Sequence, residues 1–290
     1  MKPDIDLLVH WTPNFLTWSP MYEPLQSLSG MFSSFLDGWP GLDDYQKILD
    51  AQSEMILTHA GKKLRVVKQD DKPQGFKEHY APRIYLKGEI QTRSENWHDF
   101  FQLLTWCLFP KSKAVINAIH IPRVKERIEK GVDTGRRSPV ENMLSLFDEG
   151  GAVVVSSDES LLQLIRDFQW KELFWNHRDE LAEKLQCITF GHAIYEKGLM
   201  PYVGMTANSI LLVVDKSFFR QTLEERLDYI DEQLALLFSN GTQYTKPKDL
   251  SPFPVLGLPG WDPDNELEAY YDNTDYFRRG RGGNRSSYGA

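Results

Sequence analysis

Cysteine is scarce in this sequence: Cys107 and Cys187 are the only two among 290 residues. Both stand in apolar surroundings, LTWCLF and KLQCITF. We therefore expect buried free thiols in a reducing compartment, and a disulfide between them is the less favoured alternative. Because burial disfavours the thiolate, nucleophilic Cys–His catalysis is not expected from either residue.

Long apolar runs and an excess of positive charge are also missing. No segment approaches the roughly 20 apolar residues that a membrane-spanning helix needs, and the opening MKPDIDLLVHWTP lacks the pattern of a signal peptide. The net charge of −8 disfavours a general nucleic-acid-binding protein. Four arginines in the final RRGRGGNRSSYGA leave weak RNA contact as a minor alternative. We expect a cytoplasmic protein that binds neither membrane nor nucleic acid.

Several catalytic signatures are absent as well. The sequence contains no Walker loop, no dinucleotide-binding glycine motif, no HExxH, no nucleophile elbow and no CxxC. Candidate site residues must therefore be sought among polar side chains that stand where apolar ones are expected.

Material for a hydrophobic core is ample, since 41% of the residues are hydrophobic and 12% are aromatic. Helical periodicity outweighs the few short β-branched runs, so we expect an α+β fold. It should be a predominantly helical single domain over residues 1–277, with a small mixed or antiparallel sheet. An irregular aromatic-rich segment at 1–45 should pack on this domain, and the Arg/Gly tail at 278–290 should be disordered.

The boundaries of the expected elements follow from caps, prolines and periodicity. Ser138, Pro139 and Glu141 form a capping box with proline at its preferred place. Pro122 should interrupt a helix and begin a mobile charged connection at 123–137. The expected helices are 43–58, 97–109, 111–121, 138–147, 158–168, 170–186, 188–198 and 219–238, and the expected strands are 63–68, 83–90, 152–157 and 209–215.

The helix expected over 97–109 is apolar on almost every face, which is typical of a buried helix. His98, Gln102 and Thr105 form one narrow polar stripe on it, and Asp99 lies at the edge. An unpaired buried polar group costs about 1–3 kcal/mol, so the stripe must meet partners or water. It either lines a wet cleft, as catalytic, metal-binding and substrate-binding groups, or forms a structural hydrogen-bonded seam.

Two neighbours of this stripe have the same two interpretations. Asn96 fits the N-cap of the helix, where Asp99 would bond back from the third helical position. Arg93 is either a salt-bridge partner or a contact for an anionic substrate. We retain Arg93, Asn96 and Gln102 as candidate substrate-binding residues.

A second His–acid pair lies in GHAIYEKG, where His192 and Glu196 are four residues apart on an expected helix. Side chains at that spacing project from one face. The arrangement suits two ligands of one metal ion, or a histidine oriented by its carboxylate. It also suits an ordinary surface pair. A shared site requires His192 and His98 to face one another in the fold.

His120 and Asp148 complete the set of candidates. Asp148 precedes a Gly-Gly turn at the end of an expected helix, where a carboxylate opposes the helix dipole; turn chemistry is the alternative interpretation. Imidazole and carboxylate ligands together suit a divalent metal such as zinc, manganese or iron. The candidate metal ligands are His98, Asp99, His120, Asp148 and His192.

The motifs also resemble a known pattern. The string QTR, NWHDFF, FPKSK, LFDEGGAVV, WKELF, FGHAIYEKGLMPYVGMTA, LGLPGW and YYDNTDYFR is similar to an uncharacterised bacterial family, domain of unknown function 3025, over residues 37–281. The resemblance implies a bacterial, cytosolic protein and brings no known activity, cofactor or partner. The family's motif blocks contain Asn96, His98, Asp99, Asp148, His192 and Glu196, which favours a shared site.

Two functions follow as hypotheses. The first is a metal-dependent hydrolase in which His98, Asp99, His192 and Glu196 are catalytic. The second is a non-catalytic protein that binds a small ligand or a protein partner, with the polar residues as structural seams. Convergence of the imidazoles and carboxylates on one open pocket would favour the first.

Overall fold

The computed structural model of the chain describes residues 10–35, 38–69, 75–129 and 137–280. Helices dominate it and the strands are few, which confirms the α+β expectation. Most of the tail expected to be disordered, from residue 281 onward, lies outside the described residues. Within the described ranges, no helix has both the length and the apolar character needed to cross a membrane.

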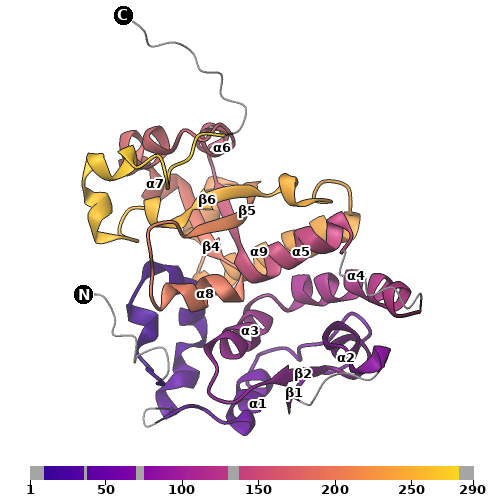
Figure 1. Cartoon of the computed structure of the whole chain (residues 1–290). Coiled ribbons are helices and arrows are strands. Elements are labelled where there is room, and N and C mark those ends of the chain that lie inside the picture. The colour runs from indigo at the N-terminus through magenta and orange to yellow at the C-terminus, as the bar shows by residue number, and fades with distance from the viewer. Residues whose placement is uncertain (1–9, 36–37, 70–74, 130–136, 281–290) are drawn as a thin grey trace, which may run out of the picture.

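The elements alternate irregularly along the chain (Figure 1). The α-helices are α1 Leu42–Asp50, α2 Tyr80–Lys87, α3 Trp97–Leu108, α4 Pro110–Glu129, α5 Pro139–Gly150, α6 Glu159–Arg166, α7 Arg178–Lys184, α8 His192–Gly198 and α9 Leu223–Asn240. The strands are β1 Arg65–Lys68, β2 Glu89–Thr92, β3 Gly151–Ser156, β4 Leu185–Thr189, β5 Thr206–Val213 and β6 Ser251–Pro254. Short 3-10 and π turns fill much of the remainder, among them η3 Pro20–Ser34 and η5 Glu172–Asn176.

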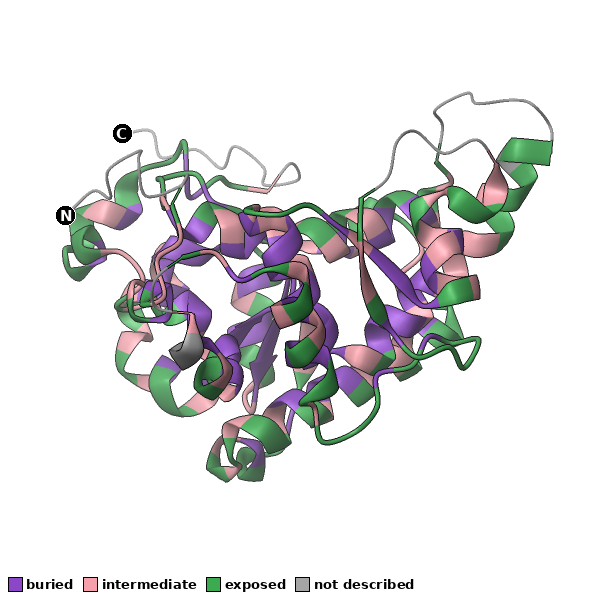
Figure 2. Ribbon diagram, turned by 90° about the horizontal axis from the view of Figure 1, so that it is seen from below, coloured by how far each residue is buried: buried purple, intermediate pink, exposed green. Residues whose placement is uncertain are grey.

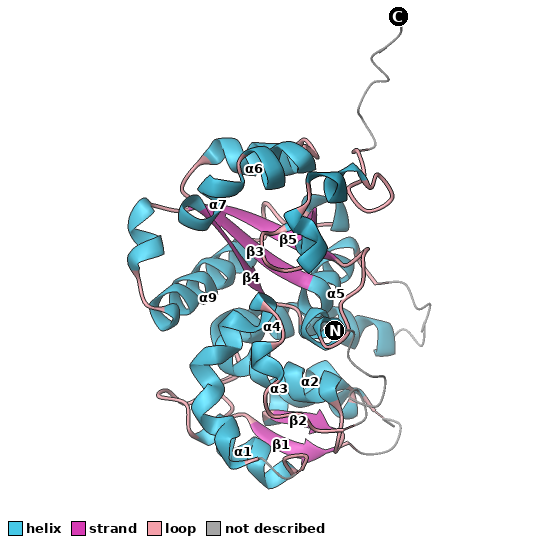
Figure 3. Ribbon diagram, turned by 90° about the vertical axis from the view of Figure 1, so that its left-hand side faces the viewer, coloured by secondary structure: helices cyan, strands magenta, loops and turns pink. Residues whose placement is uncertain are grey.

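The larger sheet is mixed, as one of the two sequence alternatives proposed. Its strand order is β4-β3-β5-β6, with β3 and β5 parallel and the two outer pairs antiparallel. A separate parallel pair, β1-β2, lies at the other end of the molecule, and α2, α3 and α4 lie between the two sheets (Figure 3).

Strand β3 lies at the centre of the packing, because all six of its residues are buried. Val153 and Val155 belong to one hydrophobic cluster, and Ala152 and Val154 belong to the other. This division follows from the alternation of side chains along a strand. Figure 2 shows buried residues in the central strands and mixed buried, intermediate and exposed residues along the surrounding helices.

The aromatic N-terminal segment packs on α3. Trp11 stacks on Trp97 with ring centroids 5.1 Å apart, and Phe15 meets the edges of Trp97 and Phe101. The hydroxyl of Tyr22 donates to the Tyr195 backbone carbonyl at 2.9 Å. These contacts bury the apolar faces of α3 and leave its polar stripe directed elsewhere.

Two local predictions were confirmed: the capping box at the start of α5 and the buried free thiols. The Ser138 hydroxyl accepts from the Glu141 N–H, and the Glu141 carboxylate accepts from the Ser138 N–H, so α5 starts as expected. Cys107 and Cys187 are buried free thiols. Burial raises the pKa of both thiols, so neither residue is a ready nucleophile.

Helix α4 runs past the proline that was expected to end it. Pro122 removes one backbone donor and costs stability, but the following RVKERIE consists largely of strong helix formers. Lys125 and Glu129 add an ion pair at i, i+4 with a 3.6 Å N–O distance. The expectation of a mobile connection over 123–137 was therefore wrong for residues 123–129, and residues 130–136 lie outside the described chain.

Other boundaries also differ. The strand expected at 83–90 was wrong for residues 83–87, which form the second half of α2, and residues 89–90 begin β2. Gly88 caps the helix between them with φ of +71°, the usual C-cap conformation. The expected helix start at 188 lies within β4, because LQCIT pairs with β3. Helix α1 ends at Asp50 rather than at 58.

Candidate functional site

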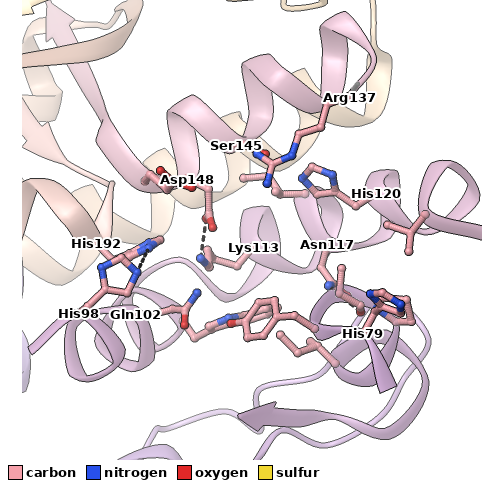
Figure 4. Close-up of a pocket in the computed structure, with 18 of the residues that line it drawn as sticks. His79, His98, Gln102, Lys113, Asn117, His120, Arg137, Ser145, Asp148 and His192 are labelled. Atoms are coloured by element: carbon pink, nitrogen blue, oxygen red, sulfur yellow. Dashed lines mark hydrogen bonds and ion pairs between the residues drawn. The ribbon is translucent and has the colours of Figure 1, made fainter. Parts of the chain in front are cut away.

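A cavity of about 710 Å³ opens between α2, α3 and α4 on one side and α5 and α8 on the other. Four of the chain's seven histidines line it: His79, His98, His120 and His192. Seven histidines spread evenly over 290 residues would put about half of one among the 19 residues that line it. The concentration of imidazoles therefore marks this cavity as the candidate site (Figure 4).

Two of these imidazoles face one another at the inner end of the cavity. The Nε2 atoms of His98 on α3 and His192 on α8 are 3.1 Å apart, and the rings are nearly perpendicular, at 88°. The Nδ1 N–H of His98 donates to Glu196 Oε2 at 2.8 Å. The structure thus joins the two motif pairs recognised in the sequence into one row: Glu196, His98, His192.

Local backbone structure positions both rings. Asn96 caps α3 by accepting from the Asp99 N–H at 3.0 Å, so the helix begins at Trp97 and His98 lies in its first turn. Gly191 precedes His192 at a close approach of two backbones. A Cβ at Gly191 would lie 2.4 Å from the Glu149 carbonyl oxygen and 2.5 Å from the Gly151 nitrogen. Only glycine lets α8 start against the end of α5.

The two imidazoles have opposite electrostatic environments. The hydrogen bond to Glu196 raises the pKa of His98 above its ordinary value of 6.5. Burial lowers the pKa of His192 to about 4, against the opposing attraction of Asp148, and Lys113 lowers it further. At neutral pH His192 is therefore uncharged, and a proton that the pair takes up resides on His98 rather than on His192.

The second ring nitrogen of His192, Nδ1, is buried and makes no hydrogen bond to the described residues. The backbone carbonyl of Asp148 favours the protonated ring, but burial of the ring outweighs it. When His98 is protonated, its Nε2 N–H can donate to the Nε2 lone pair of the neutral His192, 3.1 Å away.

Lys113 is one of two cavity residues that the sequence did not point to. Its side chain is 3% exposed, its ammonium donates to Asp148 Oδ1 at 2.5 Å, and it lies 5.6 Å from the centre of the Trp106 ring. Burial alone would raise the pKa of Asp148, but the attraction of Lys113 and of His192 holds it below the ordinary value. The available signal was a lysine on a helix face that is otherwise buried.

Tyr80 is a second residue that sequence analysis missed. It lines the cavity from the start of α2. The residue is 39% exposed overall, yet burial of its hydroxyl and the nearby carboxylates of Asp148 and Asp99 raise its pKa. The hydroxyl therefore stays protonated and remains a hydrogen-bond donor at neutral pH.

Three predicted site residues form a structural cluster instead. Arg93 donates through Nε and Nη2 to both oxygens of Asp99, at 2.9 and 2.8 Å, and its backbone N–H donates to the same carboxylate. Asn96 is the helix cap. None of the three is among the residues that line the cavity. Their alternative interpretation, a hydrogen-bonded seam at the start of α3, is the arrangement in the described structure.

The expected five-residue metal centre is not assembled. Asp99 is held by Arg93, Asp148 is held by Lys113, and His120 lies two turns further along α4 than Lys113. Among the described residues, no group of three or more His, Cys, Asp or Glu side chains is arranged to hold a metal ion. Gln102, expected to contact substrate, does line the cavity.

Comparison with known proteins gives one match. The family model described as "Protein of unknown function (DUF3025)" matches residues 64–281, three quarters of the chain, beginning later than the resemblance at 37 suggested. No curated protein and no solved structure matches the chain. The match includes every residue of the Glu196–His98–His192 row.

Proposed function

Since the chain belongs to the DUF3025 family, whose description assigns no activity, we propose its function from the geometry of the cavity. The proposal is a hydrolase with His98 as general base and acid. The observation that carries it is the row of Glu196, His98 and His192, in which a carboxylate orients an imidazole whose other nitrogen lies 3.1 Å from that of His192, and both imidazoles line the cavity.

The row supplies the proton transfers of a hydrolysis. His98 Nε2 takes a proton from a water molecule, and the water oxygen adds to the electrophilic atom of the substrate. Glu196 stabilises the resulting imidazolium through Nδ1. His192 is neutral and accepts a hydrogen bond from the new N–H of His98 until that proton passes to the leaving group.

Two further groups can stabilise negative charge as the bond breaks. Lys113 is a buried cation whose ammonium has three donors and one carboxylate partner, Asp148. Tyr80 contributes a protonated hydroxyl. Donors held in place by the fold stabilise a developing charge more than the same groups do in solution. Lys113 and Tyr80 are therefore assigned to the substrate's developing anion.

A metal-assisted hydrolase is the second candidate, and one distance favours it. Two ligands on a tetrahedral zinc-class ion, each at 2.0–2.1 Å, lie about 3.3 Å apart, close to the 3.1 Å between the Nε2 atoms of His98 and His192. Glu196 would then orient His98 as a metal ligand through its hydrogen bond to Nδ1. A third protein ligand requires Asp148 to leave Lys113.

The experiment is a hydrolysis screen with chromogenic esters, amides and phosphate esters, followed by variants. His98→Gln should lower kcat/KM by about 100-fold or more, and Glu196→Gln should lower it less. The matched control is His177→Gln, because His177 makes the same kind of contact, Nδ1 to Glu180 Oε1 at 3.2 Å, outside the cavity.

The outcomes separate the candidates. Equal activity of the His98→Gln and His177→Gln proteins contradicts the proposal, provided that both unfold at the wild-type temperature. One equivalent of metal in the purified protein, lost in His98→Gln, favours the second candidate. If none of the substrates is hydrolysed, the hydrolase proposal fails and the non-catalytic hypothesis, in which the cavity is a binding site, is favoured.

A further inference from the structure

Six side chains on one face of α4 line the cavity: Lys113, Ile116, Asn117, His120, Val124 and Ile128. Their spacing by three and four residues keeps them on one side of the helix. From residue 113 to residue 128 the helix rises about 22 Å, at 1.5 Å per residue. The cavity is therefore elongated along α4 (Figure 4).

The polarity of the wall changes along this length. The inner end holds Lys113 with Asp148 and the facing imidazoles. In the middle, Asn117 is tied to α2 through its donation to the Ala81 carbonyl at 3.0 Å, and His120 acts electrostatically on Asp148. Beyond His120, the lining residues of α4 are Val124 and Ile128. His79 and Arg137 of other segments also line the cavity, near Asn117 and His120 (Figure 4).

The apolar residues at the outer end of the cavity are partly exposed to solvent. Ile128 is 37% exposed although it lines a cavity. Pro82 of α2 lines the same cavity and has no backbone donor. The side chains of Val124, Ile128 and Pro82 offer no hydrogen-bond partner to a polar ligand. A hydrocarbon chain needs no such partner and gains from burial.

We propose that the substrate is an elongated amphipathic molecule whose unbranched hydrocarbon tail lies along Ile116, Val124 and Ile128. Its reacting polar group lies between His98 and Lys113. This inference rests on the proposed function for the position of the reacting group, and on the face of α4 alone for the tail. A cavity of about 710 Å³ lies within the range of small-molecule sites.

Binding of straight-chain alcohols tests the tail site without any turnover. Butan-1-ol, hexan-1-ol and octan-1-ol are titrated into the full-length protein by isothermal titration calorimetry. Affinity should rise by up to about 4-fold for each added methylene. The double variant Val124→Asn, Ile128→Asn should remove this dependence on chain length. The control Leu236→Asn, at a 59% exposed leucine on α9 away from the cavity, should keep it.

Equal affinity for the three alcohols overturns the inference, and so does a chain-length dependence that survives in the double variant. Each failure is distinct from failure of the hydrolase proposal. A flat alcohol series beside measurable hydrolysis removes only the tail site. A steep alcohol series in a protein that hydrolyses nothing removes only the reaction and leaves the tail site standing.

Discussion

Lys113 and Asp148 form the most consequential single contact of the cavity. The pair lies between two helices, and a buried ion pair is expensive to assemble. It persists because the ammonium also lies against Trp106 and the carboxylate is near His192. The pair sets the charge of the site, because Lys113 lowers the pKa of both Asp148 and His192, whereas Asp148 raises that of His192.

Removal of the cation should therefore be costly. Lys113→Met leaves Asp148 without its partner and should reduce the free energy of unfolding by about 2 to 4 kcal/mol at pH 7. The pKa of Asp148 lies below its ordinary value of 3.8. Its contribution is therefore fully present above that value and is lost as the pH falls through the lower folded-state value.

Urea unfolding monitored by circular dichroism measures this loss. The double variant Lys113→Met, Asp148→Asn removes both charges and should recover most of the stability, because no unpaired carboxylate remains. A double variant as unstable as the single one would show that the packing of the lysine stem, and not its charge, matters here.

At the scale of elements, the site depends on how α8 meets α5. Gly191→Ala places a methyl group 2.4 Å from the Glu149 carbonyl oxygen, and backbone must move to relieve it. We expect a loss of about 1–3 kcal/mol in stability and separation of His192 from His98. Gly30→Ala is the control, because its Cβ would meet no described atom within 4 Å.

Thermal unfolding measures the stability change, and the imidazole NMR signals of His98 and His192 report the separation. A Gly191→Ala protein as stable as Gly30→Ala, with unchanged imidazole signals, would contradict the close-approach argument.

The elements themselves were predictable to different degrees. The cap of α3 and the capping box of α5 are local, so sequence sufficed for both. The i, i+4 spacing of His192 and Glu196 was also local, and α8 ends at Gly198 as expected, although it begins at His192 rather than at 188. Strand β4 was missed because its conformation comes from pairing with β3, a contact that no local pattern reveals.

The sequence predicted the two His–acid pairs of the site but not the residues that complete it. His98 and His192 are far apart in the chain but in contact in the fold. From the sequence, this contact could be named as a requirement for a shared site but could not be predicted. Lys113 and Tyr80 were missed because their roles come from burial against distant helices. The outer wall was missed because Pro122 suggested an end to α4.

At the scale of the whole molecule, the two hydrophobic clusters share β3. Val153 and Val155 face one cluster, while Ala152 and Val154 face the other, so neither cluster can open without exposing the same strand. The Tyr22 hydroxyl also bonds to the carbonyl of Tyr195 from the opposite part of the chain. These shared contacts favour cooperative unfolding as one unit.

Urea unfolding should therefore show one transition. Far-ultraviolet circular dichroism reports helices, and tryptophan fluorescence reports the cluster around Trp97 and the one around Trp170. The two signals should change at the same urea concentration. Separate midpoints would indicate two independent domains and would contradict the expected single domain over residues 1–277.

The central claim is that Glu196, His98 and His192 share one proton at the inner end of the cavity. Long-range ¹H–¹⁵N NMR of the imidazoles between pH 3.5 and 9 tests it most directly. The account predicts that His98 titrates above the ordinary imidazole value of 6.5 and that His192 stays neutral until about pH 4. Titration of both rings near 6.5 would contradict it.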